Sequence, residues 1–253
     1  MDIYWGNRNK RKMSFLEDGE KEDKSTETDE KTNESKKKDF MPPLEHTKLH
    51  MSNIGIDGNH IYFYSEVSRT RMLELNRALE KVNLDLMKKN IEYGVSPPIY
   101  LHIHSYGGSV LSCFSTIDTI LGLDTRTISV IEGAAASAAT MISIVCDERR
   151  MTPHSYMLIH QLSSGFWGKM NEIEDEYQNL QQFMTSIREL YRKYTNIPMD
   201  ELDTMLKHDL WFDSNKCLEY NLVDSIGGAR ENKKMRTRMG GRRKVNNEGS
   251  SVV

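Results

Sequence analysis

Cysteine and long apolar runs are both scarce in this chain of 253 residues. Its three cysteines, at 113, 146 and 217, form no Cys-x-x-Cys pair, which excludes a disulfide-rich secreted scaffold and favours buried thiols in a reducing compartment. No apolar run approaches the length of a membrane span, and the first residues lack the apolar core of a secretory leader. We therefore expect a cytoplasmic protein without a membrane partner.

A strong net charge is also lacking. The formal net charge is only -3, which is too small to indicate a polyanion as the partner of the whole molecule. Basic residues gather near the end of the chain, between 233 and 244, but no aromatic residues interleave them to stack on bases. Nucleic-acid binding is therefore not expected, and a solvated basic tail is the simpler interpretation.

Large apolar residues are rare at both ends of the chain. Residues 7–38 are mostly Lys, Glu, Asp, Ser, Thr and Asn, a composition that cannot offset the entropy cost of ordering. We predict a disordered charged tail over residues 1–50, one folded domain over residues 51–229, and a disordered basic tail over residues 230–253.

Between the two tails, strand and helix patterns alternate. Alternating units of this kind predict an α/β fold with a largely parallel sheet and crossover helices. The expected strands are 60–64, 99–103, 127–131, 157–160 and 210–212, and the expected helices are about 68–90, 110–121, a helix from 137, 169–194, one starting at Pro198 and a short one capped by Ser214.

Among these elements, a run of small residues surrounds one hydroxyl. Ser137 lies in the stretch Gly-Ala-Ala-Ala-Ser-Ala-Ala-Thr at 133–140, where an apolar strand gives way to a helix. Unpaired N–H groups and the positive end of the helix dipole favour a developing oxyanion there. Tight helix packing is an equally simple explanation for the small residues taken alone.

Other residues could complete an acyl-transfer site around Ser137. His160 ends an apolar strand and could exchange a proton with the serine. Asp209, at the mouth of the next apolar strand, could orient the imidazole, although most aspartates are simply surface acids. The Gly107-Gly108 turn and the N–H of Ala138 could supply oxyanion donors.

Four motifs over about residues 54–226 resemble the proteolytic subunit of the Clp protease. The stretch His-Ser-Tyr-Gly-Gly at 104–108 resembles the family's Asn-Ser-Pro-Gly-Gly turn, and Gly-Ala-Ala-Ala-Ser-Ala at 133–138 resembles Gly-Gln-Ala-Ala-Ser-Met. Met-Leu-Ile-His-Gln at 157–161 is similar to Met-Ile-His-Gln. Lys-His-Asp at 207–209 with Glu-Tyr-Asn-Leu-Val-Asp at 219–224 resembles Arg-Asp followed by Glu-Tyr-Gly-Leu-Val-Asp.

The resemblance implies the Clp and crotonase-like fold of repeated β-β-α units. It implies a serine endopeptidase with a triad of Ser137, His160 and Asp209, and Gly108 and Ala138 as oxyanion donors. It further implies that residues 169–194 form a protruding handle helix that joins two heptameric rings into a chamber for polypeptide substrates. An AAA+ unfoldase would then supply ATP hydrolysis, and this subunit would need no cofactor.

Three positions depart from the family's pattern: Tyr106 replaces a proline, Ala134 a glutamine and His208 an arginine. No match to the family's N-terminal axial segment precedes residue 54. Other interpretations are a catalytically idle ring or scaffold subunit, a viral capsid-maturation protease of the same fold, and an acyl-CoA enzyme of the crotonase type. The filled triad positions favour an active peptidase, and they have no role in the acyl-CoA enzyme.

Overall fold

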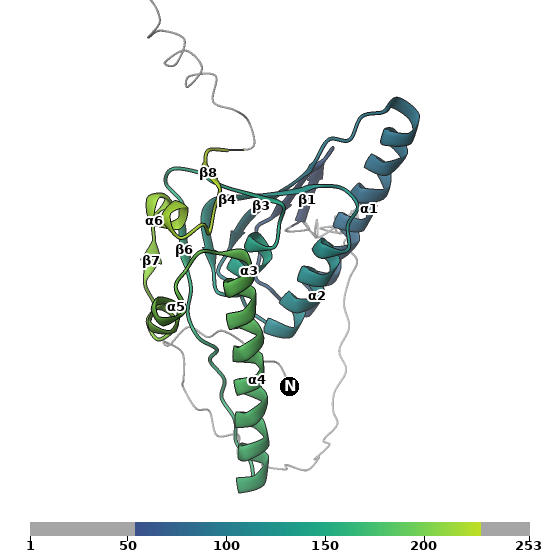
Figure 1. The fold of residues 1–253 in the computed structure, drawn as a ribbon. Coiled ribbons are helices and arrows are strands. Elements are labelled where there is room, and N and C mark those ends of the chain that lie inside the picture. The colour runs from purple at the N-terminus through teal and green to yellow at the C-terminus, as the bar shows by residue number, and fades with distance from the viewer. Residues whose placement is uncertain (1–53, 229–253) are drawn as a thin grey trace, which may run out of the picture. The chain divides into compact units, whose positions relative to one another are not determined.

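Eight strands and six helices occupy residues 54–228, which are the residues that the computed structural model describes (Figure 1). Both predicted tails lie outside this range. The elements are β1 (Ile54–Asp57), β2 (His60–Phe63), α1 (Arg69–Tyr93), β3 (Ile99–Ser105), α2 (Val110–Leu121), β4 (Thr127–Ala136), α3 (Ala138–Ile144), β5 (Glu148–Met151), β6 (Tyr156–Leu158), α4 (Met170–Tyr194), α5 (Met199–Met205), β7 (Trp211–Phe212), α6 (Ser214–Glu219) and β8 (Ser225–Ile226).

The strands form one largely parallel sheet, as the alternating pattern predicted. Its order is β1-β2-β3-β4-β5-β8, with β6 paired to the far end of β4 and β7 paired to β6. Among the strands of residues 54–228, only the pairs β1–β2 and β6–β7 are antiparallel. The α1, α2 and α3 helices are the crossovers between β2, β3, β4 and β5, and α1 and α2 lie side by side in Figure 1. The predicted α/β fold class is confirmed.

Helix α1 shows why these crossovers form where they do. The Ser68 side chain accepts a hydrogen bond from the N–H of Arg71, and Gly94 ends the helix in the left-handed conformation at φ 66°. Leu75 and Leu79 are fully buried against the sheet, whereas Leu73 and Leu84 are 52% and 56% exposed on the outer face. The helix therefore has apolar side chains both on the face that packs in the core and on a face that is exposed.

Helix α4 begins after Lys169, as predicted, and its N-terminal half extends away from the sheet (Figure 1). In its C-terminal half, Ile187 and Tyr191 are buried in the core. In its N-terminal half, which the structure describes in full, Glu176 is the only buried residue. The helix thus has an anchored end and a protruding end.

Several predicted boundaries were wrong. Strand β4 does not stop at Ile131 but continues through Ala136, because pairing with β6 adds a second ladder after the β5 ladder ends. Ser214 is the first residue of α6, and the cap is Asp213, whose side chain accepts from the N–H of Lys216 at 2.8 Å. Strands β1, β5 and β8 were not predicted; they are only two to four residues long.

Candidate active site

Ser137 occupies a tight turn between β4 and α3. Its φ is 60° and its ψ is -127°, a strained conformation for a residue with a side chain, worth about 1–3 kcal/mol. The N–H of Ser137 donates to the carbonyl of Leu158 at 2.8 Å, which holds the turn to strand β6. A serine on a strained strand-to-helix turn is the arrangement that exposes a nucleophile at the start of a helix.

The two glycines of the 107–108 turn lie directly against this serine. A Cβ at Gly107 would be 2.9 Å from Ser137 Oγ, and one at Gly108 would be 2.2 Å from the carbonyl oxygen of Val67. Their φ values are 88° and 148°, so both close approach and backbone conformation require glycine there.

The two predicted oxyanion donors are the N–H groups of Gly108, which lies between β3 and α2, and of Ala138, which follows the serine in the chain. Val67 forms an isolated bridge with Gly108. In this bridge, the Val67 N–H donates to the Gly107 carbonyl and the Ser109 N–H donates to the Val67 carbonyl, so the Gly108 N–H is not one of its donors. Ala138 is the first residue of α3, and the N–H of a first helical residue has no acceptor within its helix.

His160 and Asp209 are brought together by strand register. Strands β6 and β7 pair antiparallel with Leu158 opposite Trp211, and His160 and Asp209 each lie two residues beyond this last pair. His160 Nδ1 lies 2.8 Å from Asp209 Oδ1. The bond fixes the tautomer with the proton on Nδ1 and leaves Nε2 as the basic nitrogen.

Burial lowers the pKa of His160 from its ordinary value, and the hydrogen bond and charge of Asp209 oppose that effect only in part. The imidazole is therefore neutral at pH 7, which is the form that accepts a proton. The Asp209 side chain is 63% exposed, so solvent screens its charge.

The hydroxyl of Ser137 is not joined to this pair. Among residues 54–228, Ser137 Oγ is buried and has no hydrogen-bond partner. The structure thus brings together His160 and Asp209, and sets Gly107 against Ser137, but it forms no bond between Ser137 and His160. Catalytic hydrogen bonds often tighten only when substrate binds.

The sequence did not predict the residues that hold the Ser137 turn by hydrogen bonds on its buried side. Thr140 Oγ1 donates to the Ser137 carbonyl at 2.6 Å and also contacts the hydroxyl of Tyr191 on α4. The Cys113 thiol donates to the Ala138 carbonyl at 3.2 Å. A Thr three residues after Ser137 was a visible signal for the first contact; nothing local signals the other two.

The cysteines agree with the sequence prediction. All three are buried and free, and burial raises the pKa of Cys146 to about 12. Between residues 54 and 228 no group of three or more His, Cys, Asp or Glu could hold a metal ion. No helix in the same range is long and apolar enough to cross a bilayer.

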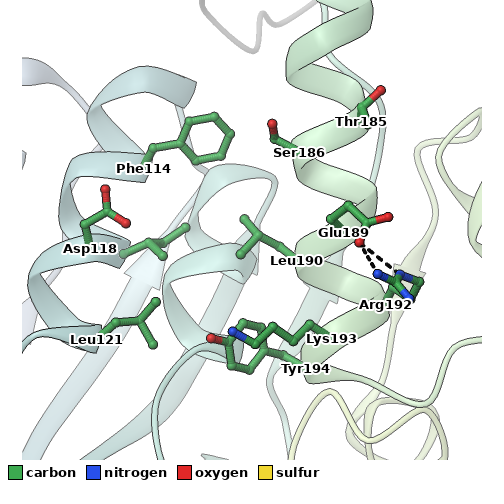
Figure 2. Close-up of a pocket in the computed structure, with 11 residues that line it drawn as sticks. Phe114, Asp118, Leu121, Thr185, Ser186, Glu189, Leu190, Arg192, Lys193 and Tyr194 are labelled. Atoms are coloured by element: carbon green, nitrogen blue, oxygen red, sulfur yellow. Dashed lines mark hydrogen bonds and ion pairs between the residues drawn. The ribbon is translucent and has the colours of Figure 1, made fainter.

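A cavity of about 630 Å³ lies between α2 and α4, away from the candidate residues (Figure 2). Leu190 and Tyr194 of α4 face Phe114, Asp118 and Leu121 of α2 across it. None of the five predicted site residues lines this cavity, so it is separate from the Ser137 turn.

The fold is that of Clp-type proteolytic subunits. A solved structure of a ClpP1 point mutant from Listeria monocytogenes superimposes with a TM-score of 0.59 at 22% identity, covering 69% of this chain and 94% of that one. At this identity the likeness establishes the fold alone.

The chain belongs to the Clp protease family. The family's model matches residues 57–230. Proteolytic subunit 1 of the ATP-dependent Clp protease of Chlamydia pneumoniae is 31% identical over 133 residues, which are 51% of this chain and 70% of that protein. Subunit 2 from Treponema pallidum is 26% identical over 170 residues, 65% of this chain and 85% of that protein. These low identities mark a divergent member.

Proposed function

We propose that this chain is a serine endopeptidase, the proteolytic subunit of a chambered Clp-like protease. The observation that carries the proposal is the β6–β7 register that places His160 Nδ1 2.8 Å from Asp209, beside the strand to which the Ser137 turn is bonded. Membership of the Clp protease family supports it.

In the proposed mechanism, Ser137 Oγ attacks the scissile carbonyl while His160 Nε2 accepts its proton. The N–H groups of Gly108 and Ala138 stabilise the oxyanion, and Asp209 stabilises the imidazolium. His160 then donates the proton to the leaving amine, and water repeats the sequence on the acyl-enzyme. Because Ser137 Oγ is buried and unbonded, its side chain or its cover must move before the first step.

The assembly is also part of the proposal. We place the chain in two stacked heptameric rings in the cytoplasm, where a separate AAA+ unfoldase uses ATP and this subunit needs no cofactor. Exposed apolar side chains on the protruding end of α4 support contact with further copies, since burying them would be favourable: Met170 is 71% and Tyr177 is 62% exposed.

A catalytically idle ring subunit is the second candidate. It is favoured by the same buried Ser137 Oγ, which makes no hydrogen bond within the described residues. An idle subunit would keep the fold and the rings but would not form an acyl-enzyme.

An alkyl fluorophosphonate probe separates the two candidates. We expect it to label the wild-type chain, to leave Ser137→Ala unlabelled and to label His160→Ala at least about a hundredfold more slowly, because the triad acts as a unit. Ser186→Ala, which removes a hydroxyl on α4 outside the site, is the matched control and should label like wild type. An unlabelled wild-type chain in an intact oligomer by native mass spectrometry would instead support the idle subunit.

A further inference from the structure

A second cavity, of about 600 Å³, lies at the β1–β2 turn and is lined by polar side chains. Its lining includes Asp57, His60, Tyr62, His102, Glu132 and, at the end of the described chain, Gly228. The lining has two carboxylates and no lysine or arginine. None of the five candidate catalytic residues belongs to it, so the cavity is a separate site.

The Glu132 carboxylate is held in a fixed orientation by Tyr64, which directly follows β2, and by His102 on β3. Tyr64 donates its hydroxyl proton to Glu132 Oε2, and His102 Nδ1 lies 2.9 Å from Oε1. Burial, with the adjacent Glu132, raises the pKa of Tyr64, so the proton stays on the phenol and the carboxylate is the acceptor. Each carboxylate oxygen accepts two hydrogen bonds when fully satisfied, so both retain capacity for a further donor.

Three aromatic side chains line the cavity together with this carboxylate: His60, Tyr62 and His102. The imidazole of His102 stacks on Tyr62 with centroids 4.3 Å apart, and that of His60 stacks on Tyr100 at 4.7 Å. A guanidinium is the cation that both stacks on such rings and binds a carboxylate with two parallel hydrogen bonds. Arg150 already lies 5.8 Å over the Tyr100 ring, and its charge is paired with Glu148 at 2.5 Å.

We propose that this cavity binds the basic segment that follows Gly228 in the same chain. Residues 230–244 contain eight lysines and arginines and a single acid, Glu231. Gly228 lines the cavity, and Arg230 comes two residues later, within about 7 Å of chain. The carboxylates of Glu132 and Asp57 are the proposed acceptors for the Arg230 guanidinium and for the lysines that follow it in the sequence. This binding does not depend on the proposed peptidase activity.

Tryptic cleavage after Arg230 tests the proposal in the full chain, with Ser137→Ala present so that self-cleavage cannot contribute. Cleavage of a docked segment requires its release. The double variant Asp57→Asn with Glu132→Gln should therefore be cleaved about fivefold faster, the factor that about 1 kcal/mol of docking supplies. The matched variant Glu92→Gln with Asp124→Asn, which removes two carboxylates outside the cavity, should be cleaved at the original rate.

Carbodiimide cross-linking tests the same docking without altering the cavity. We expect Lys233 or Lys234 to be joined to Asp57 or Glu132, and a mixture of ¹⁴N and ¹⁵N chains should give cross-links within one isotope. Cross-links only between isotopes would overturn the proposal and assign the site to a neighbouring copy. Equal tryptic rates in both double variants, or cross-links spread evenly over Glu92 and Asp124 as well, would also overturn it.

Discussion

Ser137 is held in its strained conformation by the atoms packed around it. Leu158 on strand β6 accepts its N–H, Thr140 donates to its carbonyl, and the backbone of Gly107 packs closely against its side chain. Strain of this kind persists only where the surroundings over-determine it. The side chains that impose the conformation are therefore as necessary for the proposed chemistry as the hydroxyl itself.

Gly107→Ala should abolish probe labelling of Ser137 without unfolding the chain. The added methyl group would lie 2.9 Å from Ser137 Oγ and 2.7 Å from the Ala136 carbonyl oxygen. Gly94→Ala is the control: its φ is also positive, at 66°, but nothing lies within 4 Å. It should cost about 1 kcal/mol in a urea titration and leave labelling intact. Full labelling of Gly107→Ala would contradict the turn geometry.

The pH dependence of peptide cleavage should show the lowered pKa of His160 on its acidic side. The neutral imidazole is the base, so kcat/KM should rise as the proton leaves and reach half its plateau below pH 6.5. Asp209→Asn removes the partner that raises this pKa, so the acid limb should move to still lower pH while the plateau falls by roughly 10⁴. Asp203→Asn is the control: Asp203 lies on α5 and pairs with Arg188, and its loss should change neither the position of the acid limb nor the plateau. An acid limb that moves to higher pH in Asp209→Asn would refute the assignment.

At the scale of elements, the buried half of helix α4 contacts the Ser137 turn. Tyr191 is buried, and its hydroxyl contacts Thr140, which in turn bonds the Ser137 carbonyl. Burial raises the pKa of Tyr191 more than this hydrogen bond lowers it, so the phenol stays neutral. The position of α4 and that of the turn are therefore coupled through two hydroxyl groups.

Tyr191→Phe should lower the free energy of unfolding by about 1 kcal/mol, because one buried hydrogen bond is lost and the ring remains. Peptide cleavage should fall severalfold as the first turn of α3 loosens. Tyr177→Phe is the matched control, since this residue of the same helix is 62% exposed. Urea titrations and steady-state cleavage measure both variants, and an equal effect of the two would exclude the coupling.

Across the whole described domain, Arg149 on β5 ties the end of α4 to the C-terminal elements. Its guanidinium donates to the Tyr194 carbonyl at 2.5 Å, the Asn221 carbonyl at 2.8 Å and Asp224 Oδ1 at 2.5 Å. Burial raises the pKa of Asp224, but the hydrogen bonds from Arg149 outweigh this and lower it overall. One buried cation thus joins strand β5 to two segments that are distant in sequence, the end of α4 and residues 221–224.

Arg149→Met should destabilise the domain by about 3–5 kcal/mol, because it leaves Asp224 without its cationic partner and two carbonyls without their side-chain donor. Arg126→Met removes an arginine whose side chain is 59% exposed and pairs only at the surface with Glu148; it should cost less than about 1 kcal/mol. Differential scanning calorimetry compares the two. A small change for Arg149→Met would mean that the other elements hold α6 and β8 without it.

Local pattern predicted the elements that are long or clearly periodic. The bounds of α2 were predicted at 110–121, as observed, because its caps and apolar spacing are local signals. The extension of β4 to Ala136 was missed because alanines do not signal a strand by themselves, and only pairing with β6 makes them one. The short strands β5 and β8 were missed because two to four residues carry too little pattern to be recognised.

The sequence by itself determined the order of elements and the residue types at the candidate site: the serine in its run of alanines, the paired glycines, the histidine and the aspartate. Only the tertiary structure decided the distances between them. The β6–β7 register sets His160 against Asp209, and the β3–α2 turn sets Gly107 against Ser137. It also placed the end of the domain at a polar cavity. Contacts between residues distant in the chain depend on strand pairing and packing, which no local pattern specifies.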